Sequence, residues 1–187
     1  EGAISVEPNS PAWHDHEGKD LVAAVIAVMK EFGYSKRADQ ALLQSFDLDS
    51  LKRARYELSS DLKLVQLIGE NSWNESATDF IYLQTPDGLE EVAAFADGIG
   101  PWLPQVIEID KNIPLDISQL VELAHQNGLF VHAYTLRADQ LPPELGGMST
   151  AVKILLDQTR LDGVFTDHPD QVVELRRTVK EMSGHGK

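Results

Sequence analysis

The sequence has 187 residues, of which 42% are apolar and 25% charged, a composition typical of one globular domain with a real core. No run approaches the roughly 18 consecutive apolar residues of a membrane-spanning helix, so a membrane span is not expected. The absence of cysteine excludes disulfides, thiolate metal sites and a cysteine nucleophile. Acids outnumber bases 30 to 16, and the net charge of −14 argues against nucleic acid as a partner, because it repels phosphate backbones.

Short apolar, β-branched runs alternate along the chain with longer segments whose apolar residues recur every three or four positions. In the first half, strands are expected at 3–6, 41–46 and 63–68, and helices at 20–32 and 50–58, the second capped by Asp47 or Asp49. A long polar stretch at 69–87 is expected to be an inserted loop. In the second half, strands are expected at 97–100, 129–135 and 163–166. Helices are expected at 89–96, 116–128 and 169–182, and a further helix follows the loop at 139–147 and ends near residue 158.

Six strand–helix units in a row predict an α/β fold with a parallel sheet covered by helices. Two architectures compete, an open doubly wound sheet and a closed eight-stranded barrel. A closed barrel typically takes roughly 250 residues, more than this chain has. The first strand is not followed by a glycine-rich phosphate-binding turn, which weakens the dinucleotide-binding form of the open sheet. The periodicity alone leaves this choice open.

In parallel α/β folds the functional residues lie at the carboxyl ends of strands. Glu7 ends the first strand, where its carboxylate is either a ligand for a hard cation or an ordinary loop acid. His132 and Tyr134 point to the same face of one strand, and a single strand histidine is more often a packed residue than a catalytic one. Trp102 follows a Gly-Pro turn and is either a binding wall or loop packing.

Five segments resemble, in order, those of one enzyme family, the glycerophosphodiester phosphodiesterases of the bacterial periplasmic type. They are Gln44-Ser45-Phe46-Asp47 followed by Leu51-Lys52-Arg53, Leu64 to Leu67, Ala96 to Pro101, Val131 to Arg137, and Asp162 to Asp170. Each motif alone is weak, whereas five in order at compatible spacing are a strong signal. The resemblance implies the family's (β/α)8 TIM-type barrel, of which this chain would supply about six strand–helix units. It also implies that residues 1–187 are the C-terminal part of a single barrel domain.

The resemblance further implies hydrolysis of glycerophosphodiesters to glycerol 3-phosphate and an alcohol. In this family a Ca²⁺ or Mg²⁺ ion is held by three carboxylates, and two histidines act as acid and base. Glu7 matches the third metal carboxylate, and Gln44, Phe46 and Tyr134 match pocket-lining positions. Asn9 departs from the pattern, since it stands where the family usually has lysine.

The family's histidine and remaining metal-carboxylate segments are not in this chain, and His14, His16 and His132 do not match the catalytic histidines. No catalytic residue is therefore identified, and these 187 residues alone are expected to be inactive without a missing N-terminal segment of the same protein. A periplasmic or secreted location is expected. Two alternatives are a non-catalytic phosphodiester-binding module on the same fold and a related phosphodiesterase acting on phospholipids.

Overall fold

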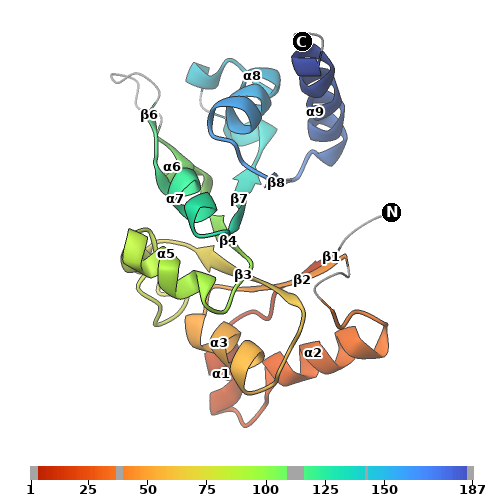
Figure 1. Ribbon diagram of the computed structural model, residues 1–187, viewed down its shortest axis with the longest axis vertical. Helices are drawn as coiled ribbons and strands as arrows, with labels where there is room; N and C mark the ends of the chain where they lie inside the picture. The colour runs from red at the N-terminus through yellow and green to blue at the C-terminus, as the bar shows by residue number, and fades with distance from the viewer. Residues whose placement is uncertain (1–3, 37–39, 109–115, 142, 185–187) are drawn as a thin grey trace. The chain divides into compact units, whose positions relative to one another are not determined.

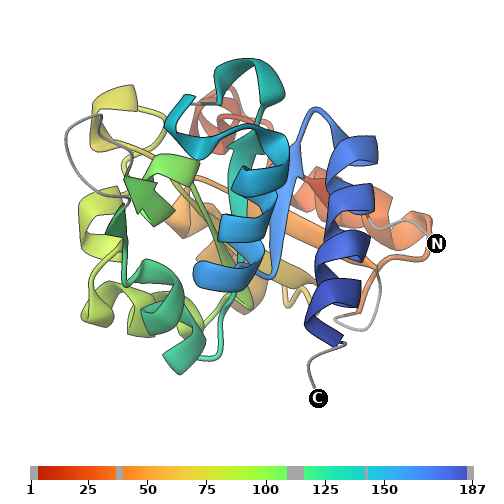
Figure 2. The same cartoon turned by 90° about the horizontal axis from the view of Figure 1, so that it is seen from above.

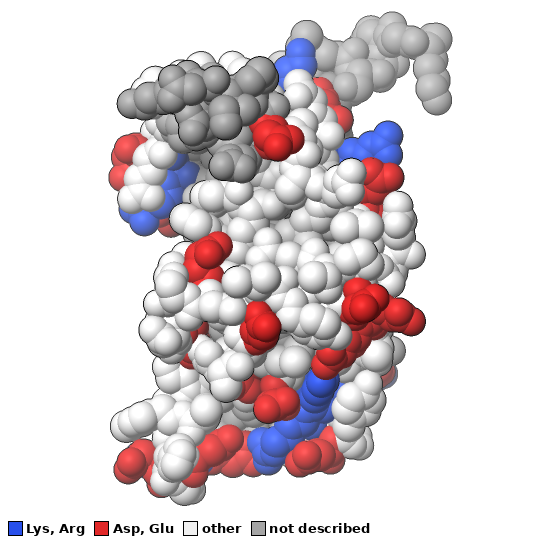
Figure 3. All heavy atoms as spheres, turned by 90° about the vertical axis from the view of Figure 1, so that its left-hand side faces the viewer, with Lys and Arg blue, Asp and Glu red and all other residues white. Residues whose placement is uncertain are grey.

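The computed structural model describes residues 4–36, 40–108, 116–141 and 143–184. The chain divides into two compact units. The first comprises residues 1–100 and 126–129, and the second residues 101–125 and 130–187. No helix among the described residues is long and apolar enough to cross a bilayer. On the face presented in Figure 3, acidic side chains are spread over the surface rather than gathered in one patch, as the net charge of −14 leads one to expect.

The sheet of the first unit has the order β1-β2-β3-β4, and β1 and β3 are each parallel to β2. Its strands are β1 (Ile4–Val6), β2 (Ala41–Ser45), β3 (Lys63–Ile68) and β4 (Gly98–Pro101). Its helices are α1 (Pro11–His16), α2 (Leu21–Glu31), α3 (Leu48–Tyr56), α4 (Phe80–Leu83) and α5 (Pro86–Ala93), with a 3-10 turn at Asn71–Trp73. Figure 1 shows α2 and α3 next to each other on one side of these strands.

The core of the first unit lies between the sheet and its helices. Leu43 of β2 and Leu64 of β3 are in register, and both are fully buried. Leu51 of α3 and Leu89 of α5 are buried as well. Asp47 caps α3, as expected, because its side chain accepts a hydrogen bond from the backbone N–H of Ser50 at 2.7 Å.

The second unit is built around two parallel strands, β7 (Phe130–Leu136) and β8 (Gly163–Thr166), whose register shifts between Ala133 and Leu136. Figures 1 and 2 both show α8 beside α9. The helices are α6 (Leu103–Val106), α7 (Leu120–Gln126), α8 (Met148–Lys153), continued by a π-helical turn at Ile154–Gln158, and α9 (Pro169–Gly184). A short antiparallel pair, β5 (Ile107–Glu108) and β6 (Asp116–Ile117), and 3-10 turns at Ala138–Gln140 and Pro143–Leu145 complete it.

The predicted strand–helix alternation is confirmed, with shifted boundaries and several short elements that were not predicted. The helix expected from residue 116 begins only at Leu120, because Asp116 and Ile117 pair with β5. The stretch 69–87, expected to be a loop, contains the 3-10 turn, α4 and the first turn of α5. Asp79 stabilises α4 by accepting hydrogen bonds from the backbone N–H groups of Ile81 and Tyr82.

Candidate functional site

Glu7, Gln44 and Ser5 lie on one face of the first sheet. Ser5 of β1 is in register with Leu42 of β2, and side chains two apart on a strand share a face. Glu7, two residues after Ser5, and Gln44, two residues after Leu42, are therefore both on the Ser5 face. The Ser5 hydroxyl donates to Gln44 Oε1 at 2.8 Å, which fixes the Gln44 amide between the two strands. The structure thus brings together two of the four predicted site residues, Glu7 and Gln44.

The Glu7 carboxyl group is in an environment that disfavours its negative charge. Burial raises its pKa above the ordinary value, a hydrogen bond from the Gln44 amide lowers it, and the charge of Glu75 raises it further. Among the described residues no Lys or Arg forms an ion pair with Glu7 or Glu75. Two coupled carboxylates without a cationic partner are suited to a hard cation with oxygen ligands.

Phe46, the third predicted site residue, follows β2 directly and is held through its backbone. Its carbonyl oxygen accepts hydrogen bonds from Gln66 Nε2 at 3.1 Å, Ser76 Oγ at 3.1 Å and Thr78 Oγ1 at 3.0 Å. The hydroxyl of Thr78 also accepts a hydrogen bond from the backbone N–H of Leu48. These bonds join the carboxyl end of β2 to the polar stretch 69–87, so this stretch positions the Phe46 side chain.

Trp73 lies against Gly69 at the carboxyl end of β3. A Cβ atom added at Gly69 would lie 2.8 Å from the Trp73 ring and 3.3 Å from the Phe46 ring. A side chain at position 69 would therefore force the Trp73 ring to shift and the Phe46 ring to move by a few tenths of an ångström. The sequence did not point to Trp73 or Glu75, because both lie in a long polar stretch that was expected to be an inserted loop.

Tyr134, the fourth predicted site residue, lies on β7 in the second unit and is half-buried. Its backbone pairs with that of Trp102 in a parallel bridge. The neighbouring His132 ring packs 4.7 Å from the ring of Phe130, measured between centroids, and a Cβ atom at Gly163 would lie 2.8 Å from it. This packing agrees with the expectation that His132 is a packed strand residue rather than a catalytic one.

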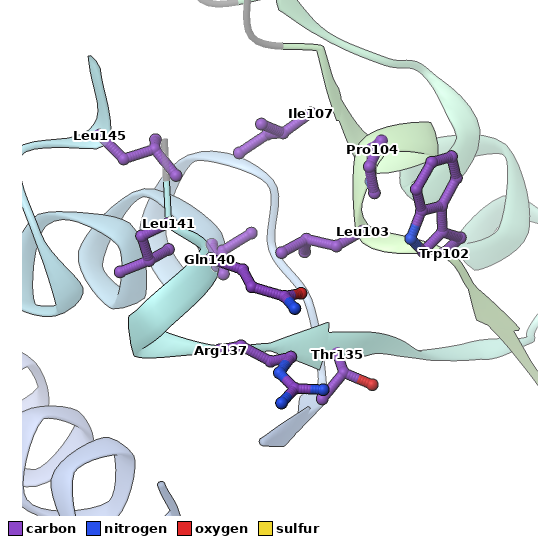
Figure 4. Close-up of a pocket in the computed structure, with 10 residues that line it drawn as sticks. Trp102, Leu103, Pro104, Ile107, Thr135, Arg137, Gln140, Leu141 and Leu145 are labelled. Atoms are coloured by element: carbon purple, nitrogen blue, oxygen red, sulfur yellow. The ribbon is translucent and has the colours of Figure 1, made fainter. Parts of the chain in front are cut away.

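The second unit also contains a cavity of about 210 Å³ next to the carboxyl end of β7 (Figure 4). Trp102 and Leu103 of α6 form one wall, so Trp102 is a cavity wall within this unit. The remaining lining side chains are Pro104, Ile107, Thr135, Arg137, Gln140, Leu141, Leu145 and Leu155. Most of the lining is therefore apolar, with a few polar groups on the strand side.

The described residues contain no group of three or more histidine, aspartate or glutamate side chains able to hold a metal ion. The Glu7 carboxylate, with Glu75 close enough to raise its pKa, fits a divalent cation as one ligand of a larger set.

Comparison with known proteins identifies the family. The model of the glycerophosphoryl diester phosphodiesterase family matches residues 2–171. The chain belongs to this family. It is 34% identical to the glycerophosphodiester phosphodiesterase of Haemophilus influenzae, covering 95% of this chain and 53% of that protein. It is 30% identical to that of Treponema pallidum, covering 89% of this chain and 51% of the relative. The chain thus spans about half the length of the curated relatives it matches.

Solved structures show the same fold. A glycerophosphodiester phosphodiesterase from Parabacteroides distasonis has a TM-score of 0.58 and 14% identity, covering 96% of this chain and 57% of that one. A protein from Silicibacter pomeroyi has a TM-score of 0.63 and 21% identity, covering 97% of this chain and 51% of that one. The family's fold is the TIM-type barrel, so the choice that periodicity left open is decided in favour of the barrel. This chain supplies the strand–helix units of β1, β2, β3, β4, β7 and β8.

Proposed function

We propose that the whole protein hydrolyses glycerophosphodiesters to glycerol 3-phosphate and an alcohol with the help of a divalent cation, Ca²⁺ or Mg²⁺. Water supplies the oxygen that bonds to phosphorus, the bond from phosphorus to the alcohol oxygen breaks, and the alcohol leaves with a proton. The observation that carries the proposal is the Glu7 carboxyl group at the carboxyl end of β1, held by Gln44 in a chain that belongs to this family.

Within this mechanism the chain's own residues bind and orient. Glu7 would be one oxygen ligand of the cation, and the cation would offset the phosphoryl charge. Gln44 keeps the Glu7 carboxylate oriented, because its amide donates to Glu7 while its carbonyl oxygen is held by Ser5. Phe46 and Tyr134 match positions that line the substrate pocket in the family. The remaining carboxylates and the acid–base pair would come from an N-terminal segment of the protein outside these 187 residues.

A substitution at Glu7 tests the proposal. Glu7→Gln keeps the shape of the side chain and its contact with Gln44 but removes the negative charge. In the whole protein we expect kcat/KM for glycerophosphocholine to fall by at least about 100-fold. Substitution of a residue that only hydrogen-bonds to a metal ligand already lowers metal affinity or activity by about 10–100-fold. Glu17→Gln, an exposed glutamate at the end of α1, is the control and should leave kcat/KM unchanged. Equal activity of the two variants would contradict the role of Glu7.

Asn9 motivates one competing function, because it stands where the family usually has a lysine that would face the substrate phosphate. A phosphodiester-binding module without turnover would bind glycerophosphocholine in the presence of Ca²⁺ and release no glycerol 3-phosphate. The Asn9→Lys variant restores the positive charge of the family's lysine and so tests the effect of this departure. If the protein is an enzyme, the wild type already hydrolyses the diester, and the Asn9→Lys variant hydrolyses it faster.

We also propose a periplasmic or secreted location, because the five motif segments resemble the periplasmic type of the family. Cell fractionation with an antibody against the chain tests this location. Recovery of the protein with cytosolic markers would contradict it.

A further inference from the structure

Trp73 is a large aromatic side chain that stays exposed at the end of the first sheet where Glu7 lies. It belongs to the 3-10 turn that follows β3, and 41% of it is exposed to solvent. Its ring lies close to Gly69, directly after β3, and the Phe46 ring approaches the same point of the backbone. Both rings therefore lie just beyond the carboxyl ends of two neighbouring parallel strands, β2 and β3, where parallel α/β folds carry their sites.

The turn that carries Trp73 is held by the residues around it. Asn71 Nδ2 donates to Asp79 Oδ1 at 2.9 Å, and Asn71 Oδ1 accepts the backbone N–H of Phe80 at 2.7 Å. These bonds join the turn to the start of α4. The buried Phe80 ring in turn packs edge-to-face on the Phe46 ring, with 6.0 Å between the centroids. The exposed indole of Trp73 is thus presented by a fixed turn on an aromatic base.

A negative charge lies next to this aromatic surface. Glu75 follows Trp73 by two residues, and it is close enough to Glu7 to act on the charge of that carboxyl group. Among the described residues Glu75 forms no ion pair with Lys or Arg. The three metal carboxylates that the family resemblance implies include Glu7 and do not include Glu75. The Glu75 carboxylate can therefore attract a second positive charge, one carried by the substrate.

An exposed indole beside a carboxylate suits a quaternary ammonium group. Such a group has no N–H to donate, so proteins bind its charge against the faces of aromatic rings, among which the indole is the strongest. A neutral group of the same shape fills the same space but gains nothing from the ring quadrupole or the carboxylate. We propose that Trp73 is a specificity-determining residue whose ring, next to Glu75, binds a quaternary ammonium group on the alcohol portion of the phosphodiester. The inference rests on the proposed function and adds to it the residue that recognises a cationic leaving group.

The test compares two substrates that differ in one atom and its charge. They are glycerophosphocholine and the diester of glycerol 3-phosphate with 3,3-dimethylbutanol, in which carbon replaces the choline nitrogen. In the whole wild-type protein we expect kcat/KM for the choline diester to exceed that for the neutral diester by at least about ten-fold, the order of a partly desolvated cation–π contact. This ratio should fall to about three-fold or less in Trp73→Leu. It should stay at about five-fold or more in Trp73→Phe, which keeps an aromatic face.

The ratio is a safe measure because both values come from one preparation, so it does not depend on the fraction of a variant that is folded. Tyr56→Leu is the matched control. Tyr56 is an exposed aromatic residue at the last position of α3, the helix that begins beyond β2, so its loss should leave the ratio unchanged. A wild-type ratio near one, or an unchanged ratio in Trp73→Leu, would overturn the inference.

A binding measurement separates this inference from the proposed function. Saturation-transfer NMR of the whole protein should show choline bound to the wild type and to Tyr56→Leu. The affinity for choline should be at least about five-fold weaker in Trp73→Leu. If the wild type hydrolyses neither diester, the proposed function fails, and choline binding then decides the inference by itself. Absence of choline binding to the wild type, or equal binding to Trp73→Leu, would overturn it.

Discussion

The Arg55 side chain of α3 stabilises the first unit through several backbone groups at once. Its guanidinium donates to the carbonyls of Phe95, Ser60 and Leu62, and to Asp97 Oδ2 at 3.0 Å. Asp97 in turn accepts the backbone N–H of Leu64 at the start of β3. Only 11% of the Arg55 side chain is exposed, so water cannot replace these bonds after a substitution.

Arg55→Met should therefore lower the free energy of unfolding by about 3 kcal/mol, because it leaves buried carbonyls and a carboxylate without their donor. Lys52→Met is the control, because Lys52 pairs with Glu91 at 2.6 Å while both side chains are about one-third exposed. We expect it to cost less than about 1 kcal/mol. Urea denaturation of the whole protein measures both changes, and equal costs would contradict the role given to Arg55.

Asp20, which caps the start of α2, is expected to make the stability of the protein depend on pH. Its hydrogen bonds with Arg53 and with the backbone N–H of Ala23 lower its pKa from 3.8 to about 2. A carboxyl group whose pKa is lower in the folded state stabilises the protein above its unfolded pKa, and this stabilisation is lost as pH falls from about 4 to about 2. Because the Asp20 side chain is 42% exposed, we expect its contribution to the free energy of unfolding to be less than about 1 kcal/mol.

The matched variant is Asp20→Asn, since asparagine still caps a helix but carries no charge. The difference in unfolding free energy between wild type and variant should shrink on acidification from pH 5 to pH 2. A difference that stays constant over this range would mean that the Asp20–Arg53 pair contributes nothing measurable.

The packing of α5 against α4 requires Gly88. A Cβ atom at this position would lie 2.1 Å from the Tyr82 carbonyl oxygen and 2.7 Å from the Leu83 Cα. Both are backbone atoms that cannot move aside without shifting α4. Gly88→Ala should therefore lower the free energy of unfolding by about 2–3 kcal/mol, although alanine is the better helix former.

Glu90→Ala, at an exposed position of the same helix, is the control and should change the unfolding free energy by no more than about 0.5 kcal/mol. Thermal unfolding of the two variants gives the comparison. If Gly88→Ala proved as stable as the wild type, α4 and α5 would not be packed as closely as the structure places them.

The sequence predicted the elements whose periodicity is strong and missed those that depend on contacts distant in the chain. β3 was predicted at its exact bounds, because an apolar run between polar turns needs no tertiary information. The β5–β6 pair was missed, since two-residue strands arise only from pairing with each other. α4 was missed because four residues are too few to show a helical period.

The same limit applies to the candidate site. Glu7 and Gln44 could be predicted, since both lie at strand ends that the family resemblance marks. The coupling of Glu7 to Glu75 could not, because Glu75 belongs to the stretch that folds over the end of β2 through Ser76 and Thr78. The cavity beside β7 could not be predicted either, because short segments far apart in sequence form its walls.

Family membership and fold are established, and the chain spans about half the length of its curated relatives. We propose that it contributes one carboxylate, Glu7, and the side chains that orient it to a catalytic centre. We therefore propose that the whole protein is a metal-dependent diesterase to which Glu7 supplies one metal ligand.

The most direct test measures the release of glycerol 3-phosphate from glycerophosphocholine by the whole protein, with millimolar Ca²⁺ or Mg²⁺ and with EDTA. We predict hydrolysis with at least one of the cations, loss of activity in EDTA, and recovery when the cation is added back. Hydrolysis that is unaffected by EDTA would contradict the metal site, and no release of glycerol 3-phosphate under any of these conditions would contradict the assignment as a glycerophosphodiesterase.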